Sequence, residues 1–316
     1  MITESAICIV PAGEGKSVWA MGEKFTFKLG AEETGGAFGL AEVIAQPRNG
    51  PPPHIHRRED ELFCVLNGEF EFVVGDKVIT RSSGFAAWLP RNGLHTYTNV
   101  GSRPGRMLVL YAPSGFEQFV AQWSHPVIHP AELPPPATSD DVDQLMTAAA
   151  DFGIEMRPSA KAVPDGSSPA VEPSFWVLGQ LVTLKLGRRE TGGKFSVVEV
   201  LCPPGTSVLE HRHVAMDEVF YVLAGTAEFT FGDRVERVAQ GGLVFVPRGE
   251  LHGFRNTGAT PVRLLDIHTP AGFEDFFREA GIPAVDTTTP PPPGPPPSPE
   301  QLQALLQRHG MELPGL

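Results

Sequence analysis

The 316-residue sequence predicts an all-β protein made of two similar β-barrels in tandem, each followed by a short helix. Three observations carry this prediction: the chain repeats itself at a fixed offset, apolar residues alternate along short segments, and Gly and Pro turn signals recur frequently. Alternation is typical of half-buried strands. Frequent turns favour many short antiparallel strands over a helical or parallel-sheet fold.

The repeat relates the two halves of the chain at an offset of 157 residues. It aligns PPPHIHRREDELFCVLNG (51–68) with VLEHRHVAMDEVFYVLAG (208–225) and GFAAWLPRNGLHTYTN (84–99) with GGLVFVPRGELHGFRN (241–256). No insertion is needed, and 316 residues are close to twice 157, so the chain reads as one duplication. The predicted domains are residues 1–157 and 158–316.

Alternation within each half predicts strands with one buried face. The segments EFEFVVG (69–75) and TAEFTFG (226–232) place phenylalanines on one face and mainly Glu or Thr on the other. Turn signals such as GDKV, GDRV, LPRNG and VPRGE separate such segments at short intervals. We therefore expect each half to close into a small barrel of antiparallel strands.

A short helix is predicted at the end of each half. Ser139 and Ser298 precede acidic first turns and are the expected N-caps, while Gly153 and Gly310 are the expected C-terminal stops. Both helices follow Pro-rich stretches. The longer stretch, TTTPPPPGPPPSP (287–299), is expected to be an extended linker.

Charge and composition exclude several classes of protein. Asp and Glu (37) outnumber Lys and Arg (25), so the net charge of −12 would repel nucleic acid and anionic membranes. The three cysteines form no CxxC motif, and no apolar run reaches the roughly 18 residues of a membrane span. The N-terminus lacks the basic and apolar pattern of a signal peptide. We therefore expect a cytoplasmic protein that binds neither nucleic acid nor membranes.

The repeated histidines predict a metal site in each half. Residues two apart in a strand share a face, so His54 and His56 can point inward together while Ile55 points away. A turn or bulge must then reset the register so that Glu61 joins this face, and His95 can return on a later hairpin. Three imidazoles and one carboxylate suit Fe, Mn, Ni, Co, Cu or Zn. The expected ligands are His54, His56, Glu61 and His95, and His211, His213, Glu218 and His252.

An incidental origin of these histidines is the competing interpretation. A lone HxH is most often incidental, and a single histidine on an apolar strand usually has hydrogen-bonded ring nitrogens within the core. Here the spacing recurs at the fixed offset although neighbouring residues differ, as Glu59 differs from Met216 and Cys64 from Tyr221. The neighbours have diverged while the candidate ligands have not, which favours one divalent transition metal in each half.

Both motifs resemble those of the cupin superfamily, and their duplication resembles a bicupin. HIHRREDELFCVLNG with PRNGLHTYTN, and HRHVAMDEVFYVLAG with PRGELHGFRN, are similar to the two cupin motifs. The resemblance implies a jelly-roll β-barrel in each half, with one metal held by each of the two ligand sets above. Two glycines of the family pattern, present as Gly205 and Gly249, are replaced by Arg48 and Asn92 in the first half. Asn tolerates the left-handed backbone of such a turn.

Apolar and aromatic residues are expected beside each metal, and they favour a planar organic substrate. A sugar-phosphate isomerase would need a convergent cationic cluster, for which Arg57, Arg58 and Arg212 are poorly placed. An oxalate-type decarboxylase would need a small polar cavity, which this lining does not suggest. The predicted lining residues are Phe63, Val65, Trp88 and Tyr97 in the first half and Phe220, Val222, Phe245 and Phe254 in the second.

Over the whole chain the sequence is similar to quercetin 2,3-dioxygenase-like bicupins, including SGFEQF (114–119) and AGFEDFF (271–277). The resemblance implies a metal-dependent dioxygenase for a flavonol-like or other enolisable aromatic metabolite. Glu61 and Glu218 would be ligands that also accept the substrate's proton, helped by a burial-raised pKa. The alternatives are a cupin isomerase, cyclase or decarboxylase of an organic metabolite, and a non-catalytic metal- or ligand-binding bicupin. Expected partners are a small aromatic or enolic substrate and O2, with homodimer formation left open.

Several other polar residues are expected to be structural. Cys64 has outward parity on its strand, so packing is favoured over redox chemistry, and Asn99 and Asn256 are expected to hold turns. Four histidines lack a ligand partner repeated in the other half and are interpreted as structural: His125, His129, His268 and His309.

Overall fold

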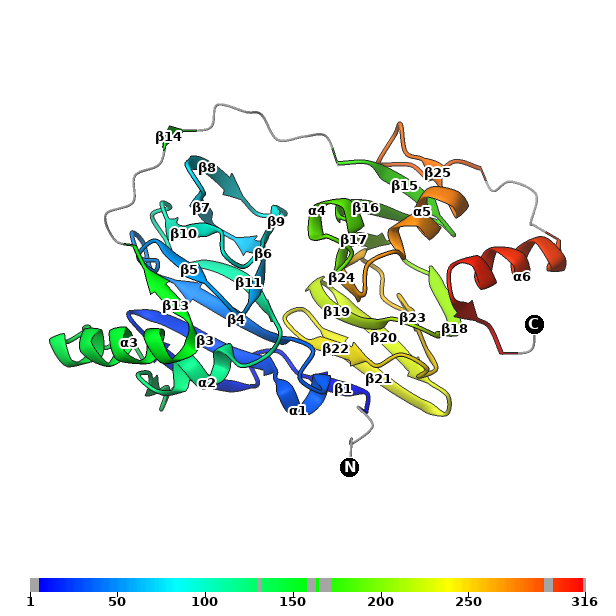
Figure 1. Cartoon of the computed structure of the whole chain (residues 1–316). Helices are drawn as coiled ribbons and strands as arrows, with labels where there is room; N and C mark the ends of the chain where they lie inside the picture. Colours follow the sequence, from blue (N-terminus) through cyan, green and yellow to red (C-terminus); the bar gives the residue numbers. More distant parts are fainter. Residues whose placement is uncertain (1–5, 130–131, 158–162, 165–171, 293–297, 315–316) are drawn as a thin grey trace. The chain divides into compact units, whose positions relative to one another are not determined.

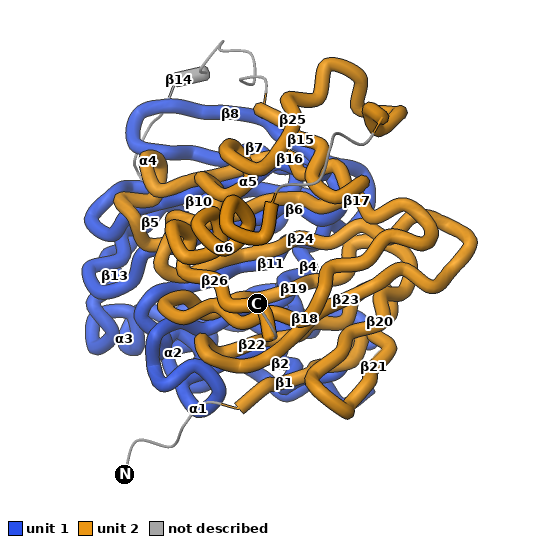
Figure 2. Tube along the Cα trace, turned by 90° about the vertical axis from the view of Figure 1, so that its right-hand side faces the viewer, with its two compact units in different colours: residues 1–5, 14–169 blue, residues 6–13, 170–316 orange. Residues whose placement is uncertain are grey.

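The computed structural model describes residues 6–129, 132–157, 163–164, 172–292 and 298–314. The chain forms two compact units, one from residue 14 through the N-terminal half and one from residues 6–13 with the C-terminal half (Figure 2). Most of the regular structure is β-strand, so the predicted all-β class is confirmed. The predicted boundary between residues 157 and 158 adjoins residues 158–162, which lie outside the described part of the chain.

Two sheets build the first unit (Figure 1). One has the order β12 (His125–Pro126), β2 (Lys16–Ala20), β3 (Glu23–Leu29), β4 (Gly39–Ala45), β11 (Gly105–Ala112), β6 (Asp60–Asn67) and β9 (Ala86–Leu89). The other has the order β13 (Ile154–Met156), β5 (His54–His56), β10 (Leu94–Asn99), β7 (Glu69–Val74), β8 (Lys77–Ser82) and β14 (Val163–Pro164). Inward-facing residues of both sheets, among them Phe63, Phe72 and Val109, share one core cluster.

The second unit repeats this arrangement. One sheet has the order β1 (Cys8–Val10), β22 (Leu243–Val246), β19 (Asp217–Ala224), β24 (Val262–Thr269), β17 (Ser196–Cys202), β16 (Gln180–Leu186), β15 (Ser174–Val177) and β25 (Ile282–Pro283). The other has the order β21 (Arg234–Ala239), β20 (Thr226–Phe231), β23 (His252–Arg255), β18 (Ser207–His213) and β26 (Met311–Glu312). Each half is therefore a barrel of two sheets around its own core, as the repeat predicts.

Strand β1 comes from the start of the chain but belongs to the second unit. Cys8–Val10 pairs antiparallel with β22, with Cys8 opposite Phe245 and Val10 opposite Leu243. A three-residue strand is too short for its alternation to stand out in the sequence, and the 157-residue repeat gives no sign of it. The second barrel thus completes its sheet with residues from the other end of the chain.

Helices follow both barrels, as predicted. Thr138, and not the predicted Ser139, caps the first long helix. Its hydroxyl oxygen accepts a hydrogen bond of 3.2 Å from the backbone N–H of Asp141, and the Asp141 carboxylate accepts one from the backbone N–H of Thr138. Gly153 ends this helix in the left-handed conformation, as predicted. The helices are α1 (Ala31–Thr34), α2 (Phe116–Ala121), α3 (Ser139–Phe152), α4 (Arg188–Thr191), α5 (Glu274–Ala280) and α6 (Pro299–Arg308).

The last helix begins where the sequence predicts. Ser298 caps α6 by accepting the backbone N–H of Gln301 at 3.3 Å, and the C-cap is His309, one residue before the predicted stop Gly310. Residues 293–297 of the predicted Pro-rich linker lie outside the described residues. No helix in the part of the chain that the structure describes combines the length and the apolar character of a membrane span.

After each long helix the chain returns to the sheet that carries the first histidines. Strand β13 pairs with β5, with Ile154 opposite His56, and β26 pairs with β18, with Met311 opposite His213. Leu145 of α3 is buried in the core of its barrel. The helix and its return strand therefore close the barrel beside the histidine pair.

The two substituted glycine positions keep the backbone that glycine favours. Arg48 has a φ of 65°, against 80° at Gly205, and Asn92 has a φ of 70°, against 85° at Gly249. The turns therefore survive both replacements. Asn adopts this region readily, whereas a long side chain such as that of Arg48 does so at a cost in backbone energy.

Candidate metal centres

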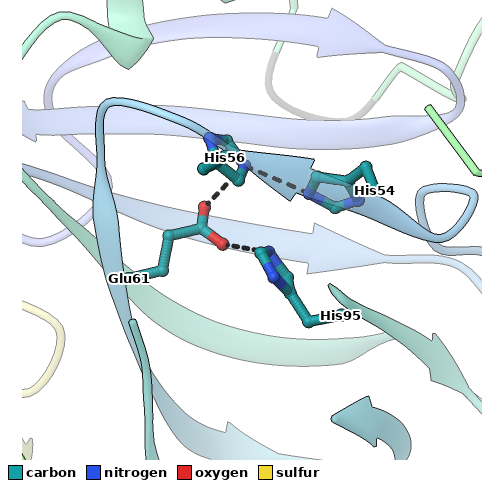
Figure 3. Close-up of side chains that lie close together, drawn as sticks. All are labelled: His54, His56, Glu61 and His95. Atoms are coloured by element: carbon teal, nitrogen blue, oxygen red, sulfur yellow. Dashed lines mark hydrogen bonds and ion pairs between the residues drawn. The ribbon is translucent and has the colours of Figure 1, made fainter. Parts of the chain in front are cut away.

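Three strands bring four side chains together in the first barrel. His54 and His56 point inward from β5, Glu61 lies at the start of β6, and His95 lies on β10 opposite His54 (Figure 3). The Nε2 atoms of His54 and His56 are 3.1 Å apart, and the Glu61 oxygens lie 3.5 Å from His56 Nε2 and 2.8 Å from His95 Nε2. All four residues are at most 7% exposed. The turn after β5 resets the register as expected.

Hydrogen bonds to the outer ring nitrogens orient these histidines. His54 Nδ1 donates to the carbonyl of Pro52 at 2.8 Å, and His95 Nδ1 donates to the carbonyl of Gly93 at 3.0 Å. His56 Nδ1 lies 3.3 Å from the carboxylate of Glu59. When Nδ1 holds the proton, Nε2 keeps a lone pair that faces the centre of the cluster, which is the usual arrangement around a bound metal.

In the second barrel, hydrogen bonds hold the outer ring nitrogens of only two of the three histidines. His211 Nδ1 donates to the carbonyl of Leu209 at 2.9 Å, and His252 Nδ1 donates to the carbonyl of Glu250 at 3.0 Å. His213 Nδ1 has no hydrogen-bond partner among the described residues. The repeat explains this difference, since Met216 stands where the first barrel has Glu59.

Both clusters fit a cation, because ring nitrogens and carboxylate oxygens that can bind a metal approach one another closely. His95 Nε2 and a Glu61 oxygen are 2.8 Å apart, and His252 Nε2 and a Glu218 oxygen are 2.7 Å apart. In the described part of the chain, none of these four buried atoms has a hydrogen-bond partner. One candidate ligand atom from each residue lies within 4.8 Å of all the others in its set. Unpartnered buried acceptors are costly, and a metal ion would satisfy them.

Ionisation in the first cluster also suits a cation. Burial, then His95 and His56, lower the pKa of His54 to about 3, so its ring is neutral. Burial alone would raise the pKa of Glu61, but His56 and His95 outweigh it and bring the pKa to about 2. This direction is opposite to the expected burial-raised pKa, because the neighbouring imidazoles can carry positive charge. Neutral imidazole and ionised carboxylate are the forms that bind metals.

The second cluster shows the same tendency. Burial, then His252 and His213, lower the pKa of His211 to about 3. Burial opposes ionisation of Glu218, yet His213 and His252 hold its pKa well below the usual range. Without a metal, the carboxylate in turn raises the pKa of His252 against the effect of burial.

The structure corrects the interpretation of His268 as structural, because His268 lies beside the second cluster. It lies opposite Glu218 on β24, with its Nε2 3.2 Å from a Glu218 oxygen, and Asp266 lies two residues earlier on the same inward face. The repeat contains a signal for both residues. Asp266 and His268 stand where the first half has Val109 and Tyr111, so two inward positions changed to possible metal ligands.

Half of the predicted lining residues border a cavity beside the clusters. The first cavity is about 120 Å³ and includes Phe63 and Tyr97 in its lining, and the second is about 90 Å³ and includes Phe220 and Phe254. Val65 and Val222 are instead buried within the two cores.

The prediction that Trp88 and Phe245 line the cavities is wrong. Trp88 pairs with Leu62, and Phe245 pairs with Val219. Paired residues of neighbouring strands share a face, so both aromatic side chains lie on the face opposite to Glu61 and Glu218. Neither is among the described lining residues of the cavities.

Glu23, which no sequence motif singles out, also lines the first cavity. The hydroxyl of Tyr97 donates to a Glu23 oxygen at 3.1 Å, and the other oxygen has no partner among the described residues. Burial raises the pKa of Glu23 to about 8, although the bond from Tyr97 opposes the shift. The second barrel has Gln180 and Phe254 at these positions. An isolated Glu at the start of a strand carries no signal of this role.

Comparison with known proteins assigns the class. The cupin domain family matches residues 41–111 and 198–268, one stretch in each barrel. Each stretch contains all four proposed metal ligands of its own barrel. The chain is therefore a bicupin, with two cupin domains in tandem.

Among whole-chain relatives, quercetin 2,3-dioxygenase of Bacillus subtilis (strain 168) is 26% identical over 293 residues, covering 87% of this chain and 86% of that protein. Mannose-1-phosphate guanylyltransferase of Sinorhizobium fredii is 32% identical over 91 residues, covering 28% of this chain and 18% of that protein.

Solved structures agree with the fold. A variant of oxalate decarboxylase from Bacillus subtilis superposes with a TM-score of 0.60 at 15% identity, covering 85% of this chain and 78% of that chain. The formate complex of Lactobacillus farciminis oxalate decarboxylase superposes with a TM-score of 0.60 at 14% identity, covering 85% of this chain and 88% of that chain. At these identities the likeness establishes the shared two-barrel architecture.

Proposed function

We propose that the protein is a metal-dependent dioxygenase that acts on a flavonol-like or other enolisable aromatic metabolite. One observation carries this proposal: in the first barrel, the His54, His56 and Glu61 side chains border a cavity that is otherwise mainly apolar and aromatic. The whole-chain similarity to a quercetin 2,3-dioxygenase supports the reaction class.

The proposed cofactor is one divalent transition metal per ligand set, drawn from Fe, Mn, Ni, Co, Cu and Zn. His54, His56, Glu61 and His95 would hold it in the first barrel, and His211, His213, Glu218 and His252 in the second. The bound metal would supply Lewis acidity toward a substrate oxygen and redox access to O2.

Glu61 and Glu218 are proposed to accept the proton of the substrate's enolic hydroxyl. Each carboxyl group is buried, borders its cavity and is ionised at neutral pH. An ionised carboxylate beside the substrate can take a proton, and the low-dielectric cavity strengthens that interaction. Because the low pKa makes a free carboxylate a weak base, the transfer would need the substrate hydroxyl to be acidified in the complex.

The polar pair of the first cavity is proposed to orient the substrate. Glu23 is neutral at pH 7, so one carboxyl oxygen accepts from Tyr97 and the other can donate to a substrate oxygen. Phe63 and Phe116 border the same cavity and supply flat apolar surface for an aromatic ring. The substrate would thus be held by rings on its faces and by one hydrogen bond at its edge.

The cavity linings disfavour a phosphorylated substrate. Neither lining contains Lys or Arg among the residues that the structure describes. Phosphate recognition relies on such groups or on backbone N–H clusters at a helix N-terminus. A neutral or weakly acidic aromatic compound fits the surroundings better.

Oxygen uptake with a flavonol tests this proposal. Metal-free protein would be loaded with each of the six metals in turn, and O2 consumption would be recorded with and without quercetin. We expect uptake that needs both metal and quercetin, and a loss of at least tenfold in His56→Ala or His213→Ala, depending on which barrel is active. His129→Ala is the matched control, because His129 is exposed and lies outside both clusters. Tight quercetin binding without uptake for any metal would instead favour a non-catalytic bicupin.

A further inference from the structure

The two barrels differ on one inward strand face beside the ligand glutamate. In the second barrel, Asp266 and His268 on β24 lie opposite Phe220 and Glu218. In the first barrel, the corresponding positions on β11 are Val109 and Tyr111, which offer no carboxylate or imidazole. The second barrel therefore has two additional metal-binding groups next to a cluster that is already complete.

The Glu218 carboxylate faces two groups of partners at once. One oxygen lies 2.7 Å from His252 Nε2 and 3.3 Å from His213 Nε2. The other oxygen lies 3.2 Å from His268 Nε2. In the first barrel, both oxygens of Glu61 face histidines of a single set. Glu218 is thus oriented as a bridge, whereas Glu61 is oriented toward one centre.

Glu218, Asp266 and His268 form a ligand set of their own. One ligand atom from each lies within 4.8 Å of the other two, and all three residues are buried. Neither ring nitrogen of His268 has a hydrogen-bond partner among the described residues, and one Asp266 oxygen also lacks one. His268 Nε2 lies 3.2 Å from a Glu218 oxygen and 3.5 Å from an Asp266 oxygen, so all three side chains converge on one point. A proton shared between the two carboxyl groups would satisfy oxygen atoms only. A cation would be bound by all three side chains at once, through carboxylate oxygens of Glu218 and Asp266 and through Nε2 of His268.

We propose that the second barrel holds two metal ions, bridged by Glu218. His211, His213 and His252 would bind one ion, and Asp266 and His268 would bind the other. Two carboxylates and an imidazole suit a divalent transition metal such as Mn, Fe, Co or Zn. This inference rests on the proposed function in one respect: the ion bound by His211, His213 and His252 is the metal proposed above for the second barrel.

The remaining coordination positions of the second ion would be open to a ligand. Glu218, Asp266 and His211 all border the cavity of the second barrel. Three protein ligands leave positions for water or for oxygen atoms of a substrate, and paired metals about 3.5–4 Å apart can hold two such oxygens at once. The second barrel would therefore suit a compound with two adjacent oxygen donors.

Metal counting tests the inference directly, with the first barrel as an internal single-metal control. The full chain would be loaded with Mn²⁺, freed of excess ion and analysed for Mn and protein. We expect three Mn per wild-type chain and two per chain in Asp266→Val/His268→Tyr, which carries the residues of the first barrel. Electron paramagnetic resonance would show a spin-coupled Mn pair in the wild type and only isolated Mn²⁺ in the variant.

The outcomes separate this inference from the proposed function. Two Mn per wild-type chain, without a coupled pair, would overturn the two-ion centre and leave the single-ion sites standing. Fewer than two Mn per chain would overturn the two-ion centre, and the same result with Fe, Ni, Co, Cu and Zn would also contradict the single-ion sites of the proposed function. Three Mn in the wild type and also in the double variant would place the extra ion elsewhere and overturn the assignment. If the double variant does not fold, the single variants Asp266→Asn and His268→Gln, which keep polar side chains of similar size, serve in its place with the same expected loss of one Mn.

Discussion

Tyr97 donates a hydrogen bond of 3.1 Å to Glu23, and the two side chains place a buried, neutral carboxyl group in the first cavity. The second barrel has Gln180 and Phe254 at the same positions of the repeat. Because the Glu23 carboxyl group is neutral in the folded protein and ionised in the unfolded chain, the free energy of unfolding depends on pH. Gln180, which does not titrate, occupies the corresponding position in the second barrel and serves as a control.

Glu23→Gln should remove one component of that pH dependence. The pKa of Glu23 is raised to about 8, so its contribution to stability is fully present below about pH 4.5 and is lost as pH rises toward 8. Over this range the loss is about 1.4 kcal/mol per pH unit. Urea unfolding from pH 5 to pH 8 should therefore show wild type losing stability relative to Glu23→Gln. Gln180→Glu should add a similar dependence, and parallel curves for all three proteins would refute the assignment.

Glu59 should strengthen metal binding in the first barrel. It lies 3.3 Å from His56 Nδ1 and orients that ring, whereas His213 Nδ1 has no partner among the described residues. Glu59→Met should weaken the first site by about 10–100-fold, and Met216→Glu should tighten the second. Titration calorimetry with Zn²⁺ on the metal-free protein would measure both changes. Glu59→Gln keeps a hydrogen-bond acceptor and should lose less metal affinity than Glu59→Met. Equal losses of affinity in the two variants would argue against a role of Glu59 in orienting His56.

Metal removal should destabilise the folded chain. Ions that bind only the native clusters add about 2.7 kcal/mol of stability at a free concentration of 100 times Kd. Thermal unfolding with and without a chelator should therefore give a lower Tm in the chelator. The shift should be smaller in His56→Ala, which has lost one cluster, and unchanged in His129→Ala. A Tm that does not respond to the chelator in wild type would mean that neither cluster holds a metal.

Backbone strain at Arg48 should be measurable against Gly205. Both residues have a positive φ, 65° and 80°, but only glycine adopts this region freely. Arg48→Gly should therefore stabilise the protein, and Gly205→Ala should destabilise it, each by about 1 kcal/mol. A Cβ at Gly205 would have no neighbouring atom within 4 Å, so the second change tests backbone conformation alone. Urea unfolding measures both, and a destabilised Arg48→Gly would show that the side chain contributes more than the strain costs.

Local patterns are sufficient to predict the barrels and to propose the two ligand sets. The unbroken repeat, the alternation of strands such as 69–75 and the spacing of His54, His56 and Glu61 are all short-range features. Residue parity within one strand groups His54 with His56, and His211 with His213. The spacing of the repeated motifs, and not parity, adds the glutamate and the third histidine of each half.

Features that depend on pairing between distant strands are harder to predict. His268 has the parity of an inward residue, but only the register of β24 against β19 places it opposite Glu218. The predicted lining position of Trp88 is wrong because parity within β9 does not fix its register against β6. Glu23 gains its role from Tyr97, which is 74 residues away. Long-range register is the information that one sequence lacks.

Strand β1 has a consequence for anyone who divides this protein at its internal repeat. A fragment that begins at residue 158 lacks Cys8–Val10, so the backbone groups of β22 that pair with them would lie at an open sheet edge. All four residues of β22 are buried and apolar, and such edges recruit strands from other molecules. Expression of the C-terminal half should therefore retain residues 6–13, for example by circular permutation, so that this edge of the sheet stays covered.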